Sequence, residues 1–211
     1  MRAGDRLIAP DGYEVALFPC AALYLTEARD PDEHDVYGLD FLPFNAEGER
    51  IVGMPCYAPF SGKIVYTGND HNCILESNDL VHAPDGSLKY MRVMVAHSWN
   101  APVKGNTYTQ GDLFYTTGSF GQSTAEHLHM EVAVVDSKDV QLWNNGGIGI
   151  YGATHMWDLL YVDNTELLRP KDYAWVTYGM LPPPVYTRGD FIPIFNNISN
   201  TKRKEVNGWR L

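Results

Sequence analysis

Short runs of β-branched and apolar residues, separated by turn residues, constrain the fold of this chain more than any other feature. Turn sequences such as Gly-Asn-Asp at 68–70 and Pro-Asp-Gly at 84–86 punctuate the chain. The clearest runs are residues 64–66, 91–96, 113–115 and 130–135. Many short strands at close spacing are typical of an antiparallel sheet or a barrel-like sandwich. We therefore predict a mainly β fold with long loops and one or two short helices, near residues 155–160 and 165–169.

The composition fits one domain, with or without an appendage, and narrows the class of partners. Of the 211 residues, 45% are hydrophobic and 20% are charged, which is enough to bury a core. With 16 Lys and Arg against 26 Asp and Glu, the formal net charge is −10. This balance argues against a nucleic-acid binder and against electrostatic binding of a polybasic surface to an anionic membrane or wall. No apolar run approaches the roughly 20 residues that span a bilayer.

The three cysteines predict neither a disulfide framework nor a thiolate zinc site. Cys20, Cys56 and Cys73 are odd in number and show no Cys-x-x-Cys spacing. The seven histidines are therefore the more informative residues, and they are few enough to examine one by one.

Two segments near the ends of the chain bear on targeting and domain organisation. The apolar stretch 14–25 has no small-residue cleavage site, so we interpret it as a buried strand pair broken at Pro19 and expect no signal peptide. The sequence Leu-Pro-Pro-Pro at 181–184 marks a boundary, because proline removes backbone donors and ends sheet pairing. The mostly polar residues that follow are too few for a further domain and are predicted to form a tail.

The strongest chemical signal is Glu-His-Leu-His-Met-Glu-Val-Ala-Val-Val at 126–135. On a strand, side chains alternate between the two faces. The even-numbered positions then form one apolar face: Leu128, Met130, Val132 and Val134. His127, His129 and Glu131 share the opposite face, where two imidazoles can converge on one point. Taken by itself, a His-x-His pair more often reflects packing or surface histidines, but here the apolar face gives the pair a fixed platform.

Two further segments of the sequence carry side chains that could join His127 and His129 in one site. His97 ends the apolar run 91–96, and a histidine at a strand end faces a loop or a cleft. His34 and Asp40 lie close together in the sequence, and imidazole nitrogen and carboxylate oxygen are good zinc ligands. Asp40 is flanked by Leu39 and Phe41, so we expect it to be buried with a partner or a metal. Each of these residues, taken alone, also has a purely structural interpretation.

Taken together, these pieces resemble the lysostaphin-type (LytM-like) zinc endopeptidases, which cut peptides of bacterial peptidoglycan. The pieces stand in the family's order: His34 with Gly38-Leu39-Asp40-Phe41; Tyr-Ala-Pro-Phe-Ser-Gly-Lys-Ile-Val at 57–65; Val95-Ala96-His97; and Gly-Ser-Phe-Gly-Gln-Ser-Thr-Ala-Glu-His-Leu-His-Met-Glu-Val at 118–132. Gly111-Asp112 and Thr117-Gly118 also match the hairpin that precedes the last histidine strand. The resemblance covers residues 30–135.

The resemblance implies a LytM-type peptidase domain with one zinc ion and assigns roles to five residues. His34, Asp40 and His129 correspond to the zinc ligands, and His97 and His127 to the catalytic pair beside the metal-bound water. Five residues separate His34 from Asp40, where many family members have three. The implied division of the chain is N-terminal lead-in strands at 1–29, a peptidase core at 30–135, an elaboration packed on the core at 136–180, and a Pro-rich boundary with a C-terminal tail at 181–211.

The function expected from this resemblance is zinc-dependent hydrolysis of peptide bonds in the stem peptides or cross-bridges of peptidoglycan. The lack of a signal peptide fits a bacteriophage protein, either a virion-associated enzyme that penetrates the wall or an endolysin. Such a protein would reside in the virion, or in the host cytoplasm before lysis, and would act at the cell wall. We expect other virion proteins to bind its C-terminal tail, and neither nucleic acid nor a membrane span to be involved.

Three other functions are compatible with parts of the sequence. A domain of the same fold that had lost its metal would regulate or build a phage particle, and the spacing after His34 favours it. A biotinyl- or lipoyl-type carrier barrel shares the pattern at 58–65, but no Met-Lys-Met-like tripeptide supplies its lysine. A sugar-binding β-sandwich fits the strands and leaves the histidines unexplained.

The remaining polar residues near these motifs have less specific interpretations. Glu131 either orients one of the imidazoles without itself binding the metal, or it is an ordinary exposed glutamate. His71 and His82 are expected to be background. His155, which opens the first predicted helix, is undecided.

Overall fold

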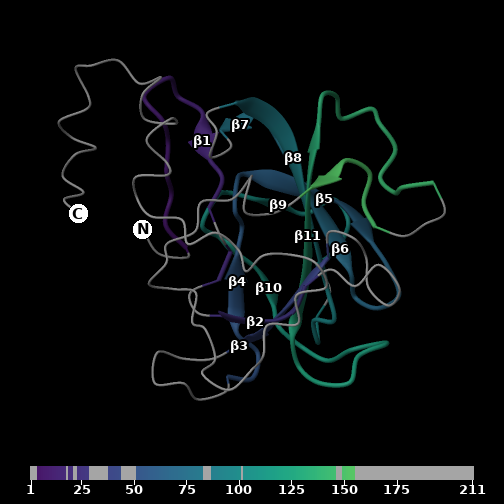
Figure 1. Cartoon of the computed structure of the whole chain (residues 1–211). Coiled ribbons are helices and arrows are strands. Elements are labelled where there is room, and N and C mark those ends of the chain that lie inside the picture. The colour runs from purple at the N-terminus through teal and green to yellow at the C-terminus, as the bar shows by residue number, and fades with distance from the viewer. Residues whose placement is uncertain are drawn as a thin grey trace.

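The computed structural model describes residues 4–17, 19–20, 23–28, 38–43, 51–82, 87–100, 102–145 and 149–154 (Figure 1). For residues 23–28 the description is of the backbone. The structure of these ranges is mainly β and includes no helix, which confirms the predicted fold class. Within them there is accordingly no helix that could serve as a membrane span. The two predicted short helices, at 155–160 and 165–169, lie outside the described residues.

Twelve strands make up two sheets in this part of the chain. The strands are β1 (Glu14–Val15), β2 (Leu23–Ala28), β3 (Leu39–Pro43), β4 (Pro55–Tyr57), β5 (Gly62–Thr67), β6 (Cys73–Ser77), β7 (Val81–His82), β8 (Leu88–Ala96), β9 (Thr107–Tyr108), β10 (Leu113–Thr116), β11 (Leu128–Val135) and β12 (Ala153–Thr154). The four runs singled out in the sequence lie within β5, β8, β10 and β11.

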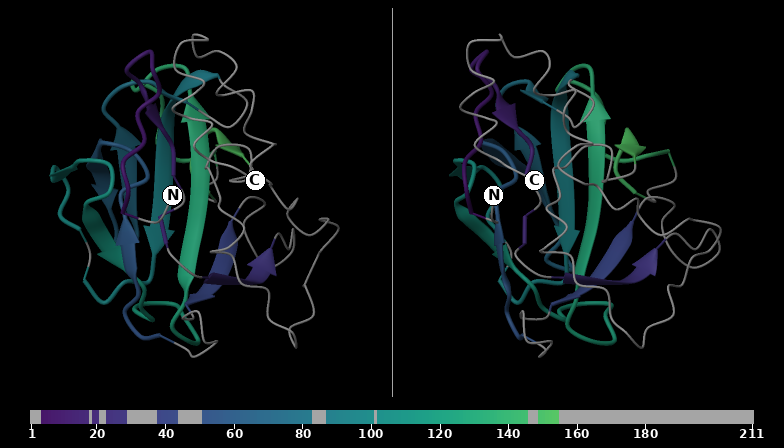
Figure 2. Two further views of the ribbon diagram at one scale, coloured as in Figure 1. Left: turned by 90° about the vertical axis from the view of Figure 1, so that its left-hand side faces the viewer. Right: turned by 60° about the vertical axis from the view of Figure 1, so that its left-hand side comes forward.

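In the described part of the chain, the large sheet is open rather than closed into a barrel. Its main path runs β2-β3-β11-β8-β6-β5-β9, and all the pairs along that path are antiparallel. The long strands β8 and β11 lie side by side at its centre (Figure 2). Among the described residues no pairing joins β2 to β9, so the two edges of the large sheet do not meet. The sheet is curved, and the small β4–β10 sheet lies beside it.

Residues 14–25 do not form the pair of strands bonded to each other that the sequence predicted. β1 and β2 do flank Pro19, but they do not pair with each other. β1 pairs in parallel with β7, and β2 pairs antiparallel with β3. The reason is that the backbone around Pro19 is used elsewhere: the Leu17 N–H donates to the Pro59 carbonyl, and the Tyr57 N–H donates to the Pro19 carbonyl.

Apolar side chains cover both faces of the large sheet. The larger cluster lies between this sheet and the segment around β4 and includes Phe41, Met54, Cys56, Phe60, Ile64, Val93, Leu128 and Met130. A smaller cluster covers the other face and includes Ile74, Met94, Ala96, Ala133 and Ile150. The central strands are therefore held from both sides, which fixes the positions of the residues at their ends.

The three cysteines are buried thiols in the larger core or at its border. The Sγ atoms of Cys20 and Cys56 lie 3.0 Å apart, a thiol contact rather than a bond. They therefore contribute apolar packing.

Candidate active site

Strand register brings the predicted site residues together at one end of the large sheet. β11 lies between β3 and β8, and His129 of β11 pairs with Asp40 on one side and with Ala96 on the other. His97 directly follows Ala96 at the end of β8, and His127 directly precedes β11. Three neighbouring strands thus deliver four polar side chains to one place, although Asp40 and His129 are 89 positions apart in the sequence.

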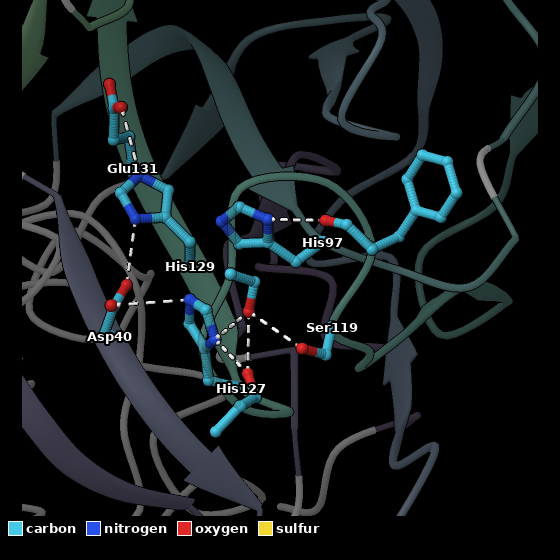
Figure 3. Close-up of polar contacts among 9 residues, drawn as sticks. Asp40, His97, Ser119, His127, His129 and Glu131 are labelled. Atoms are coloured by element: carbon cyan, nitrogen blue, oxygen red, sulfur yellow. Dashed lines mark hydrogen bonds and ion pairs between the residues drawn. The ribbon is translucent and has the colours of Figure 1, made fainter.

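The alternation of faces along β11 follows the sequence pattern. Leu128, Met130 and Val132 belong to the larger core cluster. The intervening residues His129 and Glu131 point to the opposite face, where Figure 3 shows them one behind the other along the strand. The apolar residues thereby anchor the strand on which the imidazole is presented.

Asp40 is the shared partner of two histidines (Figure 3). Its Oδ1 lies 2.9 Å from His129 Nδ1, and its Oδ2 lies 3.4 Å from His127 Nε2. The side chain of Asp40 is 15% exposed and those of both histidines are 13% exposed. The expectation that Asp40 lies inside the protein with a partner agrees with this geometry, since a carboxylate so withdrawn from water needs compensating contacts.

Glu131 lies behind His129 and is itself buried. Its Oε1 is 3.4 Å from His129 Nε2, and its Oε2 accepts a hydrogen bond from the Ile150 N–H at 2.8 Å. The residue is 2% exposed, which excludes the interpretation as an ordinary surface glutamate. Burial lowers the pKa of His129, but hydrogen bonds to Asp40 and Glu131 outweigh it and raise that pKa to about 10.

His97 occupies a left-handed backbone conformation, with φ of 76°, at the point where β8 ends. Its Nδ1–H donates to the Phe120 carbonyl at 2.9 Å, so the lone pair of the neutral ring is on Nε2. The ring centroid lies 4.7 Å from that of His127 and 6.3 Å from that of His129. Burial and the neighbouring histidines lower the pKa of His97, partly opposed by the hydrogen bond to Phe120 and by the charge of Asp40.

His127 is oriented by the loop that precedes β11. Its Nδ1–H donates to the Ala125 carbonyl at 2.7 Å, and the Ser123 hydroxyl lies 3.2 Å from the same nitrogen. The neighbouring Glu126 is nearly buried and accepts hydrogen bonds from the Thr117 hydroxyl and the Gly53 N–H. These contacts hold the entry to β11, so the ring of His127 is fixed with Nε2 toward Asp40.

The donor set suits a metal ion, and two of the three expected ligands are adjacent. Asp40 Oδ1 and His129 Nδ1 face each other, and Glu131 supports the other nitrogen of the imidazole, a pattern common behind metal-binding histidines. The third expected ligand, His34, lies outside the described residues. Within the described ranges no group of three or more His, Cys, Asp or Glu side chains meets the geometry of a metal site.

Several contacts at the site are not identifiable from the sequence motif. The carbonyl groups of Phe120 and Ala125, which fix the two imidazole rings, leave no side-chain signature. Ser123 and Glu126 both lie inside the motif at 118–132. Glu126 is next to His127, and a polar residue beside a functional histidine is the signal that would have found it. His82 hydrogen-bonds to Asp11 in the N-terminal segment, and His155 lies outside the described residues.

Comparisons with known proteins give relatives that include a phage protein, and several peptidase structures. No protein-family model matches the chain. Morphogenesis protein 1 of Bacillus phage B103 is 24% identical over 183 residues, which are 85% of this chain and 48% of that protein. The chain thus spans about half the length of this curated relative.

Among solved structures, the catalytic domain of the antimicrobial peptidase lysostaphin from Staphylococcus simulans is similar to this chain. It is 26% identical, with 66% of this chain and 86% of that chain covered and a TM-score of 0.37. A zinc-containing peptidase from Vibrio cholerae is 20% identical, with 64% and 46% covered and a TM-score of 0.39.

Proposed function

We propose that this chain is a zinc-dependent endopeptidase that hydrolyses peptide bonds in bacterial peptidoglycan. The observation that carries the proposal is the meeting of Asp40, His97, His127 and His129 at the ends of three neighbouring strands. The motifs and their order, which resemble those of lysostaphin-type peptidases, support the same conclusion. Stem peptides and cross-bridges are the two classes of substrate that fit this activity.

His34, Asp40 and His129 would hold one zinc ion. When bound, zinc polarises the scissile carbonyl and lowers the pKa of a coordinated water toward about 7. Asp40 and His129 already face each other, and the buried Glu131 fixes the orientation of the His129 ring. The role of Glu131 is thus to position a ligand.

His97 and His127 would handle the proton and the developing negative charge. Both rings donate Nδ1–H to a backbone carbonyl, so each presents Nε2 to the site. In the described part of the site, His127 Nε2 faces the Asp40 carboxylate at 3.4 Å, whereas His97 Nε2 has no such neighbour. We therefore assign proton acceptance and delivery to the leaving amine to His97, and stabilisation of the oxyanion to His127.

A phage virion is the setting that we propose for this activity. The name of the relative from Bacillus phage B103, a morphogenesis protein, supports an association with particle assembly. In this proposal residues 30–135 form the peptidase core, 1–29 lead into it, 136–180 elaborate it, and the tail at 181–211 binds other virion proteins. The net charge of −10 favours delivery by a particle over attraction to an anionic wall.

Digestion of purified peptidoglycan tests the proposal. Mass spectrometry of the fragments should reveal one class of newly cleaved peptide bond, absent after treatment with a chelator and restored by zinc. His129→Ala should abolish the cleavage while the circular dichroism spectrum of the chain is retained. Unchanged cleavage by that variant would defeat the zinc mechanism.

A metal-free structural domain of a phage particle is the second candidate. It is favoured by the hydrogen bond between Asp40 and His129 and by the 3.4 Å contact between Asp40 and His127, which partner these groups without an ion. The name of the phage relative fits this role as well. Elemental analysis separates the two functions, because a well-folded chain that takes up no zinc at micromolar concentration would exclude the enzyme.

A further inference from the structure

The backbone that carries His97 is held in a conformation that it would not adopt alone. A left-handed φ at a non-glycine residue is uncommon, and it persists only where the surroundings over-determine it. His97 has this conformation at φ of 76°. The contacts around His97 and its successor Ser98 therefore decide where the His97 ring points.

All four backbone polar groups of these two residues are hydrogen-bonded to other segments. The His97 N–H donates to the Asp70 carbonyl at 3.2 Å, and the His97 carbonyl accepts from the Phe120 N–H at 2.9 Å. The Ser98 N–H donates to the Tyr115 hydroxyl oxygen at 2.6 Å. The Ser98 carbonyl accepts from His71 Nδ1–H at 2.8 Å, which makes His71 the one histidine among these partners.

His71 also touches the residue that fixes the His97 ring. Its imidazole stacks on the Phe120 ring, with centroids 3.6 Å apart and planes inclined by 2°. The Phe120 carbonyl is the acceptor for His97 Nδ1–H, the contact drawn as a dashed line beside His97 in Figure 3. One side chain thus braces both the backbone that follows His97 and the loop that carries its acceptor.

Gly118 and Gly121 show that the 118–121 loop packs closely against the end of β8 and the 68–72 turn. A methyl group on Gly118 would overlap the His97 carbonyl, and one on Gly121 would overlap the Asp70 carboxylate. The loop therefore cannot be displaced slightly without moving either the 68–72 turn or the end of β8. His71 and Phe120 fill the contact between that turn and that loop.

We propose that His71 is a positioning residue for His97, acting through Ser98 and Phe120 and without contact to substrate. The inference rests on the proposed peptidase function of the site, because it gives His97 the proton-transfer role. In this arrangement the His71 ring keeps His97 Nδ1–H on the Phe120 carbonyl and His97 Nε2 toward the reacting groups. The sequence assigns His71 no role, because nothing local to Gly-Asn-Asp-His at 68–71 predicts a contact with residues 98 and 120.

Three substitutions separate the two contacts of His71. His71→Asn retains a side-chain donor and tolerates the left-handed φ of 53°, but loses the ring stack. His71→Phe retains a stacking ring and loses the donor, and His71→Ala loses both. We expect His71→Ala to lower kcat for wall-peptide cleavage by roughly 10- to 100-fold with little change in KM, and the other two to fall between it and the wild type.

His82→Phe is the matched control. His82, which is more deeply buried than the part-buried His71, likewise makes a ring hydrogen bond, but its partner is Asp11 in the N-terminal segment. This variant should lose stability as the His71 variants do, and keep kcat. Nitrogen-15 NMR of the histidine side chains gives a readout without turnover: His97 should be a single Nδ1-protonated tautomer in the wild type and a mixture of tautomers in His71→Ala.

The outcomes are distinguishable. A fall in kcat together with a mixed His97 tautomer supports the positioning role. An unchanged kcat, or a loss of activity that His82→Phe reproduces while the His97 tautomer stays single, overturns it. A wild-type chain that cleaves no wall peptide defeats the proposed function, and the tautomer measurement then decides the inference by itself.

Discussion

At the scale of single residues, Asp40 is the charge on which the candidate site depends. It is largely withdrawn from water and is the common partner of His127 and His129. Removing its negative charge takes away one proposed ligand and leaves two imidazoles facing a neutral amide. The energetic effect falls on the site rather than on the core, because Leu39 and Phe41 keep β3 in place.

Asp40→Asn tests this dependence with almost no change in shape. We expect zinc content to fall below stoichiometric and peptidoglycan cleavage to drop by roughly 100-fold or more, because an amide oxygen is a weaker zinc ligand than a carboxylate. Elemental analysis and timed digestion measure the two quantities. Asp79→Asn, the same change on an exposed turn, should match the wild type in both. Full zinc content and full activity in Asp40→Asn would contradict the assignment.

The three cysteines carry reactive thiols that their surroundings make unreactive, unlike Asp40, whose carboxylate is proposed to act at the candidate site. Burial raises the pKa of the Cys20 thiol, with contributions from Cys56, and burial likewise raises the pKa of Cys73. A thiol reacts as its thiolate, so raising the pKa and excluding the reagent both slow alkylation.

We therefore expect the native chain to resist iodoacetamide at pH 8 and the denatured chain to take up three labels. Intact-mass spectrometry before and after addition of denaturant measures the number of labels. The denatured sample is the internal control for reagent quality. Rapid labelling of Cys73 in the native chain would show that β6 is less protected than its burial implies.

At the scale of elements, a buried ion pair ties the central strands to the segment that follows β11. Arg92 of β8 is fully buried and pairs with Glu76 of β6 at 2.7 Å. The same guanidinium donates to the carbonyls of Gln141, Lys138 and Val140. One side chain thus holds a loop of irregular backbone against a regular sheet.

Removing one partner of this pair should cost more stability than removing both. Arg92→Met leaves Glu76 and three carbonyls without their donor, and a loss of about 3–5 kcal/mol in the free energy of unfolding is expected. The double variant Arg92→Met with Glu76→Leu should recover part of that loss, because no charge is then left unpaired. Urea unfolding measures both. A single variant within about 1 kcal/mol of the wild type would mean that water replaces the pair.

Also at this scale, register decides which predicted residues meet. The alternation of faces in β11 follows from its sequence, since apolar and polar residues alternate from Leu128 to Val132. That β3 would lie beside β11, with Asp40 opposite His129, is not contained in either strand. β1 and β2 show the same limit: the sequence predicts a strand on each side of Pro19, but it does not indicate that β1 pairs with β7 and β2 with β3.

At the scale of the whole molecule, the net charge of −10 governs how the chain approaches an anionic wall. Like charges repel, and the repulsion is screened by salt. The Debye length falls from roughly 30 Å at 0.01 M salt to roughly 8 Å at 0.15 M. A protein that relied on basic patches would bind the wall more weakly as salt rises, and this chain should do the reverse.

Cleavage of isolated wall material should therefore become faster when sodium chloride is raised from about 0.01 M to about 0.15 M. Initial rates at low substrate concentration measure the effect. A soluble, uncharged peptide substrate should be cleaved at a rate that is nearly independent of salt, which separates wall approach from catalysis. A rate on walls that falls steadily with salt would contradict this expectation and would point to a localised basic surface.

The sequence by itself determined the β character of the chain, the two faces of β11 and the chemical types gathered at the site. These properties are local: they follow from a period of two along a strand and from the residues that favour turns. Only the tertiary structure decided that the sheet stays open, that Glu131 is buried behind His129, and that His71 reaches Ser98 and Phe120. The physical reason is that such contacts join residues far apart in the chain, and close packing in three dimensions selects them.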